Sequence, residues 1–361
     1  MARPRGLGAD PSTAPPETPP PMIVTPAEAQ AILRKTIPER LPILLAGAPG
    51  VGKTAIVSQV AHELARELVV SHPVTSDPTD FRGLPWMVDG KATFLPIGDL
   101  ARLIALGDRP AVWLIDDLGQ ALTSTQAAVM QLVHRDSRAL NGFSLPDNVA
   151  IVACTNRAED RAGVGAFLAP LVSRFTTVLT VCPEAKSFVP WAIQHGGFHP
   201  VVAAFLRWKE DYLLDTSRPS HSLEQRCSPR TWDNVSRLLK LGLRSSELAA
   251  PIQGAITPSI ATEFLAFLQV FENLPDIDLV RADPDGAPLP PSVDATYATA
   301  VHLARKVERA DFDLIARYVA RLAPEFQLLF NLSSITRKPE LRSTTAYIAW
   351  ASRPEITSML S

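Results

Sequence analysis

The sequence predicts an α/β protein in which a mainly parallel sheet is followed by a helical second half. Short apolar runs alternate with amphipathic stretches as far as about residue 183, a pattern typical of parallel strands flanked by helices. Beyond that point the strand signals stop, and helical patterns separated by proline-rich loops follow. We therefore expect a disordered tail over residues 1–24, an α/β core over 25–183, a helical domain over 184–275 and a helical C-terminal extension over 276–361.

Each expected element rests on a local pattern. Residues 1–22 hold seven of the 33 prolines and can bury little apolar surface, so we expect no fold there. Apolar residues from Ile56 to Leu68 recur at i, i+3 and i+4 and predict a helix. Buried strands are expected at residues 43–46, 69–74, 111–115, 149–154 and 176–181. The clearest later helices are expected at residues 232–243, 259–271, 295–307 and 311–322, with a long loop over 275–291.

Composition excludes several classes of protein. The chain has 361 residues with 35 Lys+Arg and 37 Asp+Glu, so its net charge is −2, which argues against a general nucleic-acid or membrane binder. No apolar run is long enough to span a membrane and no signal peptide is evident, so we expect a cytoplasmic protein. The cysteines Cys154, Cys182 and Cys227 lack CxxC spacing, which predicts neither a disulfide framework nor a zinc site.

A phosphate-binding loop follows the first expected strand. The pattern G-x-x-x-x-G-K-[ST] is matched by Gly47, Ala48, Pro49, Gly50, Val51, Gly52, Lys53 and Thr54, and an amphipathic helix begins at its end. Glycines allow backbone N–H groups to wrap phosphates, and the helix N-terminus adds partial positive charge. Lys53 would place a cation on the phosphates, and the Thr54 hydroxyl would ligate Mg²⁺. The motif predicts ATP and Mg²⁺ as cofactors.

An apolar strand that ends in two carboxylates comes about sixty residues later. Residues 112–115 lead directly into Asp116 and Asp117, as the second half of such a site requires. Asp116 would hold Mg²⁺ through water. Asp117 stands where a glutamate commonly polarises the attacking water, and its side chain is one methylene shorter.

From Pro26 to the C-terminus the sequence resembles the AAA+ superfamily and, within it, the MoxR family. Residues 151–156 resemble the strand that ends in sensor 1, here Asn156, which would orient the lytic water. Residues 168–175 resemble the segment that carries the arginine finger, here Arg174, directed at a neighbouring subunit's γ-phosphate. Residues 228–232 resemble the sensor 2 motif, whose arginine is Arg230. Arg157 and Arg161 are rival candidates for the finger.

Two expected hairpins carry the resemblance to the MoxR branch. Asn141-Gly142 lies at the turn of residues 138–145, which resemble the pre-sensor 1 hairpin of that clade. Asp89-Gly90 lies at the turn of residues 86–94, which resemble its helix 2 insert, with residues 77–83 as the lead-in. The alternative for the second is an ordinary surface hairpin in which Trp86 and Phe94 pack on each other.

The resemblance implies a three-layer αβα P-loop core with a mainly parallel five-stranded sheet, a helical lid and a helical extension. It also implies a homo-oligomeric ring, expected to be a hexamer, that hydrolyses ATP at subunit interfaces to remodel a client. The expected partner is a von Willebrand factor A domain protein or another protein. Two alternatives remain open: a nucleic-acid motor or restriction-type subunit, which the near-neutral charge disfavours, and a slowly hydrolysing scaffold, which Asp117 suggests. The tail and the helices from about residue 276 depart from the minimal family pattern.

Overall fold

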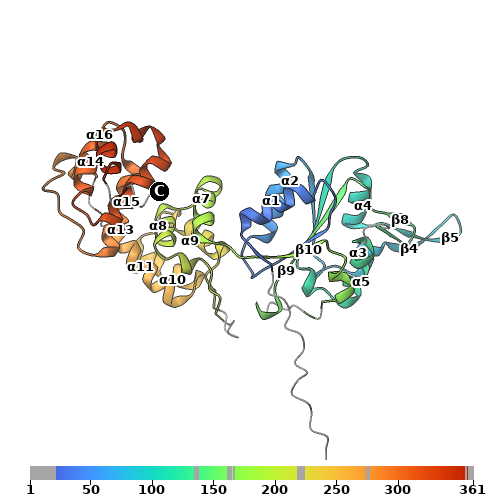
Figure 1. The fold of residues 1–361 in the computed structure, drawn as a ribbon. Coiled ribbons are helices and arrows are strands. Elements are labelled where there is room, and N and C mark those ends of the chain that lie inside the picture. The colour runs from blue at the N-terminus through green and yellow to red at the C-terminus, as the bar shows by residue number, and fades with distance from the viewer. Residues whose placement is uncertain are drawn as a thin grey trace, which may run out of the picture.

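The computed structural model describes residues 22–133, 138–160, 165, 167–217, 224–272, 274, 277–353 and 356. Its first part is built around a sheet, and its second part consists of helices, as Figure 1 shows. The expected change from α/β to all-helical structure therefore occurs. Most of the expected tail lies outside the described residues.

The central sheet has six parallel strands in the order β1-β10-β2-β9-β6-β3. The strands are β1 (Ile23–Val24), β2 (Ile43–Ala46), β3 (Glu67–Ser71), β6 (Ala111–Ile115), β9 (Val149–Thr155) and β10 (Thr177–Val181). The prediction of five strands was wrong by one, because Ile23 and Val24 pair with Thr180 and Val181. The expected disordered tail also extended too far along the chain, since Val24 is buried in the core. Strand β3 starts and ends earlier than expected, because it pairs with β6 from Glu67 to Ser71.

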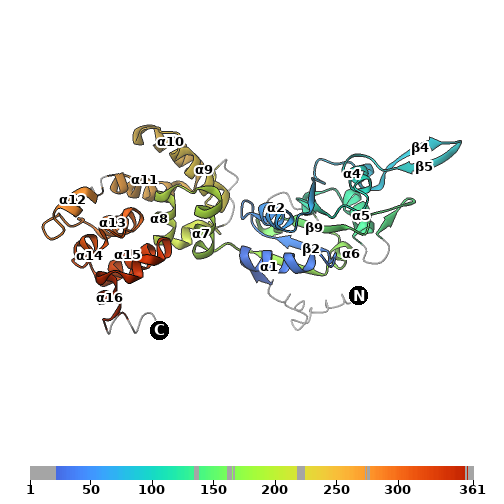
Figure 2. The ribbon, with the colours of Figure 1, turned by 90° about the horizontal axis from the view of Figure 1, so that it is seen from above.

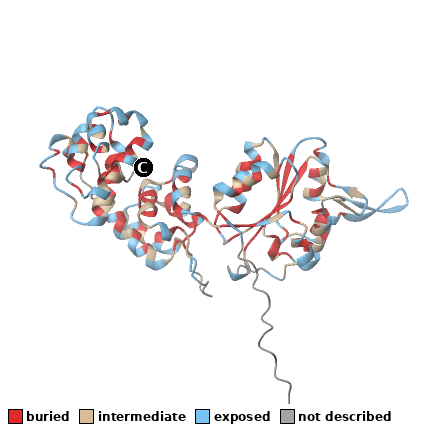
Figure 3. Cartoon of the chain, viewed as in Figure 1, coloured by how far each residue is buried: buried red, intermediate tan, exposed pale blue. Residues whose placement is uncertain are grey.

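Helices cover both faces of the sheet. On one face, α1 (Pro26–Thr36) and α2 (Lys53–Glu63) pack on residues such as Val112 and Leu114 of β6. On the other face, α3 (Pro78–Arg82), α4 (Gly98–Ala105), α5 (Thr123–Leu132) and α6 (Ala169–Val172) pack on Trp113 and Ile115. Because successive strand residues face opposite sides, the apolar run of β6 supplies both cores. Figure 3 shows the middle strands of this sheet as buried.

Both expected hairpins form at the expected turns. Strands β4 (Leu84–Val88) and β5 (Lys91–Leu95) are joined by Asp89 and Gly90, whose φ values are 50° and 75°. Strands β7 (Ala139–Leu140) and β8 (Phe143–Ser144) are joined by Asn141 and Gly142, at 53° and 91°. Two positive φ values are what a tight hairpin turn requires. Figure 2 shows β4 and β5 extending away from the sheet.

The packing of Trp86 on Phe94 does not occur. Trp86 pairs with Thr93, and Phe94 pairs with Pro85. Directly paired residues share a face and successive residues alternate, so the two rings point to opposite faces of the hairpin. Trp86 is 59% exposed and Phe94 is 37% exposed.

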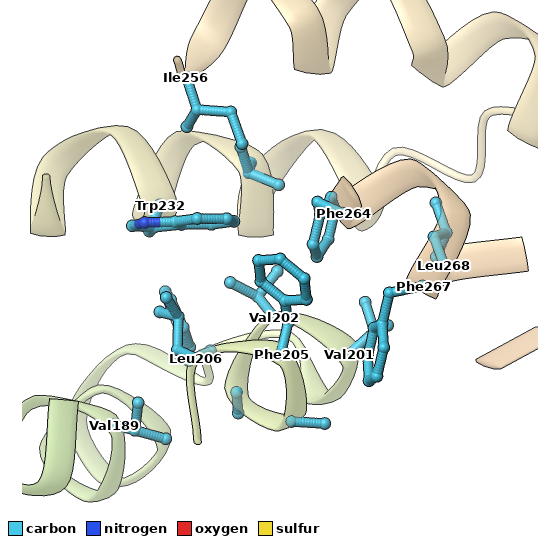
Figure 4. Close-up of a cluster of buried hydrophobic side chains, with 14 of the residues drawn as sticks. Val189, Val201, Val202, Phe205, Leu206, Trp232, Ile256, Phe264, Phe267 and Leu268 are labelled. Carbon is cyan, nitrogen blue, oxygen red and sulfur yellow. The ribbon is translucent and has the colours of Figure 1, made fainter. Parts of the chain in front are cut away.

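Aromatic packing organises the first helical cluster. Phe205 lies at its centre, between Trp232 and Phe264, as Figure 4 shows. Its ring centroid is 5.6 Å from that of Trp232 and 5.1 Å from that of Phe264. The helices are α7 (Ala185–Gly196), α8 (Pro200–Trp208), α9 (Pro229–Leu239), α10 (Ser245–Ala255) and α11 (Pro258–Glu272). Their buried residues form one hydrophobic core separate from the cores on the sheet.

A second cluster contains α12 (Ile277–Ala282), α13 (Val293–Lys306), α14 (Phe312–Val319), α15 (Pro324–Arg337) and α16 (Thr345–Ala351). The loop expected over residues 275–291 is interrupted by α12, because Ile277 and Val280 bury their side chains in this core. Helix α13 contributes Ala298 and Val301 to the first cluster and Leu303 to the second, so it joins them. Short 3-10 helices occur at Leu118–Gln120, Ala158–Asp160, Glu210–Leu213 and Pro339–Ser343. Among the described residues no helix is long and apolar enough to cross a membrane.

Candidate nucleotide-binding site

A cavity of about 530 Å³ lies where the end of the sheet meets α7 and α9. One side is formed by the phosphate loop and the ends of β6 and β9, and the other by the helical part and the start of α1. The predicted site residues that line it are Pro49, Gly50, Val51, Gly52, Lys53, Thr54, Asp116, Asp117, Asn156 and Arg230. Gly47 and Ala48 do not line the cavity, and their backbone carbonyls accept hydrogen bonds from Lys53 Nζ.

The phosphate loop follows β2 and passes into α2 at Lys53. Gly50 and Gly52 have φ values of 81° and 97°, a region that side chains disfavour. Gly47 has a different constraint: a Cβ there would lie 2.8 Å from the Val181 carbonyl oxygen at the end of β10. The glycines of the motif thus allow both the turn and its close packing on the sheet.

Lys53 is the buried cation of the site, 7% exposed. Its Nζ donates to the Gly47 and Ala48 carbonyls at 2.8 and 3.1 Å and to Asn156 Oδ1 at 2.8 Å. Burial lowers the pKa of Lys53, while the nearby carboxylates Asp116 and Asp117 oppose that shift. A buried ammonium held mainly by neutral acceptors is well suited to an anionic ligand.

Carboxylates and a hydroxyl stand beside this cation. The Thr54 hydroxyl donates to Asp116 Oδ2 at 2.7 Å, so the two expected Mg²⁺ ligands are in contact. Asp117 has a φ of 55°, and its N–H donates to Asp116 Oδ1 at 3.1 Å. Asn156 Nδ2 donates to Asp117 Oδ1 at 3.2 Å, so this amide links Lys53 to Asp117. The positive φ of Asp117 is uncommon for residues other than glycine, and such conformations occur often at functional sites.

The donor chemistry fits a magnesium nucleotide. Carboxylate and hydroxyl oxygens are the ligands that Mg²⁺ prefers, and it usually keeps several waters and phosphate oxygens. Among the described residues no group of three or more His, Cys, Asp or Glu could hold a metal ion by itself. Thr54 and Asp116 could therefore form only part of a shell, as expected for a metal that is bound together with phosphates.

Helix α9 brings Arg230 to the phosphate loop. Ser228 caps this helix, and the Arg230 N–H donates to the Gly50 carbonyl at 3.2 Å. A Cβ on Gly50 would lie 2.7 Å from Ser228 Oγ. The contact is thus close enough that only glycine fits on the loop side.

The three candidates for the arginine finger differ in their surroundings. Arg174 does not line the cavity, and its Nη1 donates to the Met130 carbonyl near the end of α5. Arg157 forms ion pairs with Asp160 at 2.8 Å and Glu159 at 3.0 Å. Arg161 lies outside the described residues.

Sequence motifs missed the apolar half of the cavity. Phe188 and Trp191 of α7, together with Phe198, face residues at the start of α1 across it. Trp191 Nε1 donates to Gln59 Oε1 at 3.1 Å, which joins α7 to α2. No short motif marks these side chains, and their only signal was a pair of aromatic residues three apart on a helix after the last strand.

Residues 43–182 match the family model for the ATPase family associated with various cellular activities (AAA). The matched region runs from the start of β2 to the residue after β10. The chain is also similar to solved structures of RuvB from Thermotoga maritima. One mutant has 17% identity, covers 81% of this chain and 86% of that chain and gives a TM-score of 0.40. A structure described as the RuvB Holliday junction branch migration motor has 17% identity, with 82% and 86% covered and a TM-score of 0.38. No curated protein matches the chain.

Proposed function

We propose that this protein hydrolyses ATP with Mg²⁺ in this cavity and uses the reaction, as a ring, to remodel a partner protein. The observation that carries the proposal is that Lys53, Asp116, Asp117, Asn156 and Arg230, from four separate segments of the chain, line one cavity. The match of residues 43–182 to an ATPase family supports the same activity. The cytoplasm is the compartment we expect.

Each side chain has a role that its contacts support. ATP would supply the γ-phosphoryl group for transfer, and Mg²⁺ would spread its charge. Lys53 would neutralise phosphate charge from its buried position, and Thr54 and Asp116 would hold the Mg²⁺ ion. Asn156 already donates to Asp117 Oδ1, so Asp117 would take the proton of the attacking water through Oδ2. Arg230 would add a cation from α9.

The finer assignment to the MoxR family rests on the sequence resemblance and on the two tight hairpins. With it we propose domain boundaries at residues 183/184 and 275/276, a hexameric ring and a protein client. A von Willebrand factor A domain protein is the partner that this resemblance favours. The β4–β5 hairpin leaves Trp86 and Met87 exposed, 59% and 62%, which is consistent with contact to another protein.

Ring assembly makes a sharp prediction about Arg174. Because Arg174 lies outside its own chain's cavity lining, we propose that it acts on the nucleotide of a neighbouring subunit. Removal of an arginine finger can cost about 10³–10⁵ in rate. Arg174→Ala should therefore bind ATP but barely hydrolyse it.

Mixing experiments test whether this arginine acts in trans. Arg174→Ala supplies an intact Asp117, and Asp117→Asn supplies an intact Arg174, so mixed rings should regain part of the activity. The same mixture with Arg157→Ala in place of Arg174→Ala tests the rival finger. Unfolding curves of Arg174→Ala control for loss of its bond to Met130. If mixed rings form and no activity returns, Arg174 acts within its own subunit or supports only the structure.

A further inference from the structure

Two polar side chains meet beside the strand end that leads into Asp116. Ser71 is the last residue of β3, and Asp99 is in the first turn of α4. The Ser71 hydroxyl donates to Asp99 Oδ2 at 2.7 Å and accepts from Trp113 Nε1 at 2.8 Å. Ser71 is 5% exposed and Trp113 is fully buried, so the bond between them is shielded from water. Neither Ser71 nor Asp99 lines the nucleotide cavity.

The main chain of Ser71 binds Asp116 itself. The Asp116 N–H donates to the Ser71 carbonyl at 2.9 Å, directly after the paired residues of β3 and β6. Asp116 Oδ2 accepts from the Thr54 hydroxyl at 2.7 Å, so this bond lies next to the two expected Mg²⁺ ligands. Ser71 therefore binds this segment of the chain twice, through its hydroxyl at Trp113 and through its carbonyl at Asp116.

The same contacts anchor the β4–β5 hairpin at both of its ends. Phe81, in α3 just before β4, stacks on Trp113 with ring centroids 5.9 Å apart. Asp99, in α4 shortly after β5, accepts from the Ser71 hydroxyl. The segments that enter and leave the hairpin are thus fixed to two side chains that are bonded to each other. A movement of the hairpin base would therefore reach the main chain at Asp116 through Ser71.

We propose that Ser71 and Asp99 are positioning residues that hold Asp116 in place for Mg²⁺ and connect the base of the β4–β5 hairpin to the metal side of the site. This inference rests on the proposed function, since it requires Asp116 to take part in Mg²⁺ binding. Groups that hold a metal ligand by hydrogen bonds contribute to metal affinity without touching the metal. Without the Ser71 hydroxyl, Trp113 Nε1 would be a buried donor that lacks this partner, and the strand end would lose a bond that fixes it.

Titration of nucleotide binding with Mg²⁺ tests this role. The probe is a fluorescent ATP analogue that cannot be hydrolysed, and its affinity is measured in EDTA and over a series of MgCl₂ concentrations. Ser71→Ala and Asp99→Ala should raise the MgCl₂ concentration for the half-maximal gain in affinity by about tenfold, the lower end of what the hydrogen-bond partners of a metal ligand contribute. Affinity in EDTA should stay parental, because the phosphate loop is unchanged. Asp99→Asn should behave like the parent, since its amide oxygen can still accept from the Ser71 hydroxyl.

The matched control is Ser334→Ala, which removes another fully buried serine hydroxyl, one that donates to the Phe330 carbonyl within α15. Its Mg²⁺ requirement should equal the parental value. Parental Mg²⁺ requirements in both Ser71→Ala and Asp99→Ala would overturn the proposal. An equal loss of nucleotide affinity with and without Mg²⁺ would also overturn it, because a merely structural role predicts that result.

Asp116→Asn separates this inference from the proposed function. The variant should lose most of the gain in affinity that Mg²⁺ gives. If it does so while Ser71→Ala and Asp99→Ala do not change the Mg²⁺ requirement, only the positioning role is wrong. If the parental protein shows no such gain, or Asp116→Asn keeps it, the assignment of Mg²⁺ to this carboxylate is wrong and the positioning role fails with it.

Discussion

At Gly50 the phosphate loop and α9 approach so closely that a side chain has no room. A Cβ there would lie 2.7 Å from Ser228 Oγ and 3.2 Å from Arg230 Cβ, and the φ of 81° disfavours any residue but glycine. Gly50→Ala should therefore lower ATP affinity by about tenfold or more, since such a φ alone costs about 1–2 kcal/mol. Gly254→Ala is the control, because Gly254 lies within α10 and a Cβ there meets nothing within 4 Å. Calorimetric titration with ATP should separate the two, and equal affinities would contradict the close contact.

His199 predicts a pH dependence of stability. Burial lowers its pKa below the ordinary value of 6.5, with Arg305 and Lys240 adding to the shift. Above that value the histidine is neutral in both the folded and the unfolded protein, so its contribution to the free energy of unfolding is fully present. Below it the histidine of the unfolded chain binds a proton, whereas the histidine of the folded protein stays neutral. The free energy of unfolding therefore falls with pH until the lowered pKa of the folded protein is reached.

His199→Asn should reduce this loss of stability on acidification. His199 caps α8 by accepting from the Val201 N–H at 3.4 Å, and asparagine is a strong N-cap that does not titrate. Urea unfolding at about pH 7 and about pH 5.5, on either side of the ordinary histidine pKa, measures the effect. The same fall in unfolding free energy for both proteins would assign the acid sensitivity to other groups.

At the scale of elements, α8 is the centre of the first helical cluster. Phe205 is fully buried, and its ring lies 5.1 Å from Phe264 and 5.6 Å from Trp232. Phe205→Ala should lower the free energy of unfolding by about 3–5 kcal/mol, because it leaves a cavity among aromatic rings. Leu241→Ala, at a side chain that is 66% exposed, should change it by less than about 0.5 kcal/mol. Chemical denaturation followed by tryptophan fluorescence tests the pair, and similar losses would refute the central role of Phe205.

The strands and hairpins were predictable because their signals are local. The apolar run that became β6 and the Asp89-Gly90 turn specify their own conformation. The edge strand β1 was not predictable, since its two residues form a strand only by pairing with β10. Helix α12 was not predicted for a similar reason: its six residues are too few to show a helical period, and Ile277 and Val280 are fixed by distant partners.

At the scale of the whole molecule, the polar half of the cavity could be predicted and the apolar half could not. Lys53, Thr54 and Asp116 belong to motifs whose spacing reflects one strand-to-helix turn and one strand end. Phe188 and Trp191 reach the cavity only because α7 folds back toward α1 and α2, and that packing is set by tertiary contacts. The position of Arg174 at the Met130 carbonyl likewise depends on how α5 and α6 meet.

The central claim is that this cavity binds and hydrolyses ATP, and separate measurements of ATP binding and turnover in two variants test it most directly. Lys53→Ala removes the buried cation and should lose most ATP affinity. Asp117→Asn keeps an oxygen that can accept from Asn156, so it should bind ATP with near-parental affinity while turnover falls by about a hundredfold or more. Parental ATP turnover by Lys53→Ala would contradict the assignment of the site.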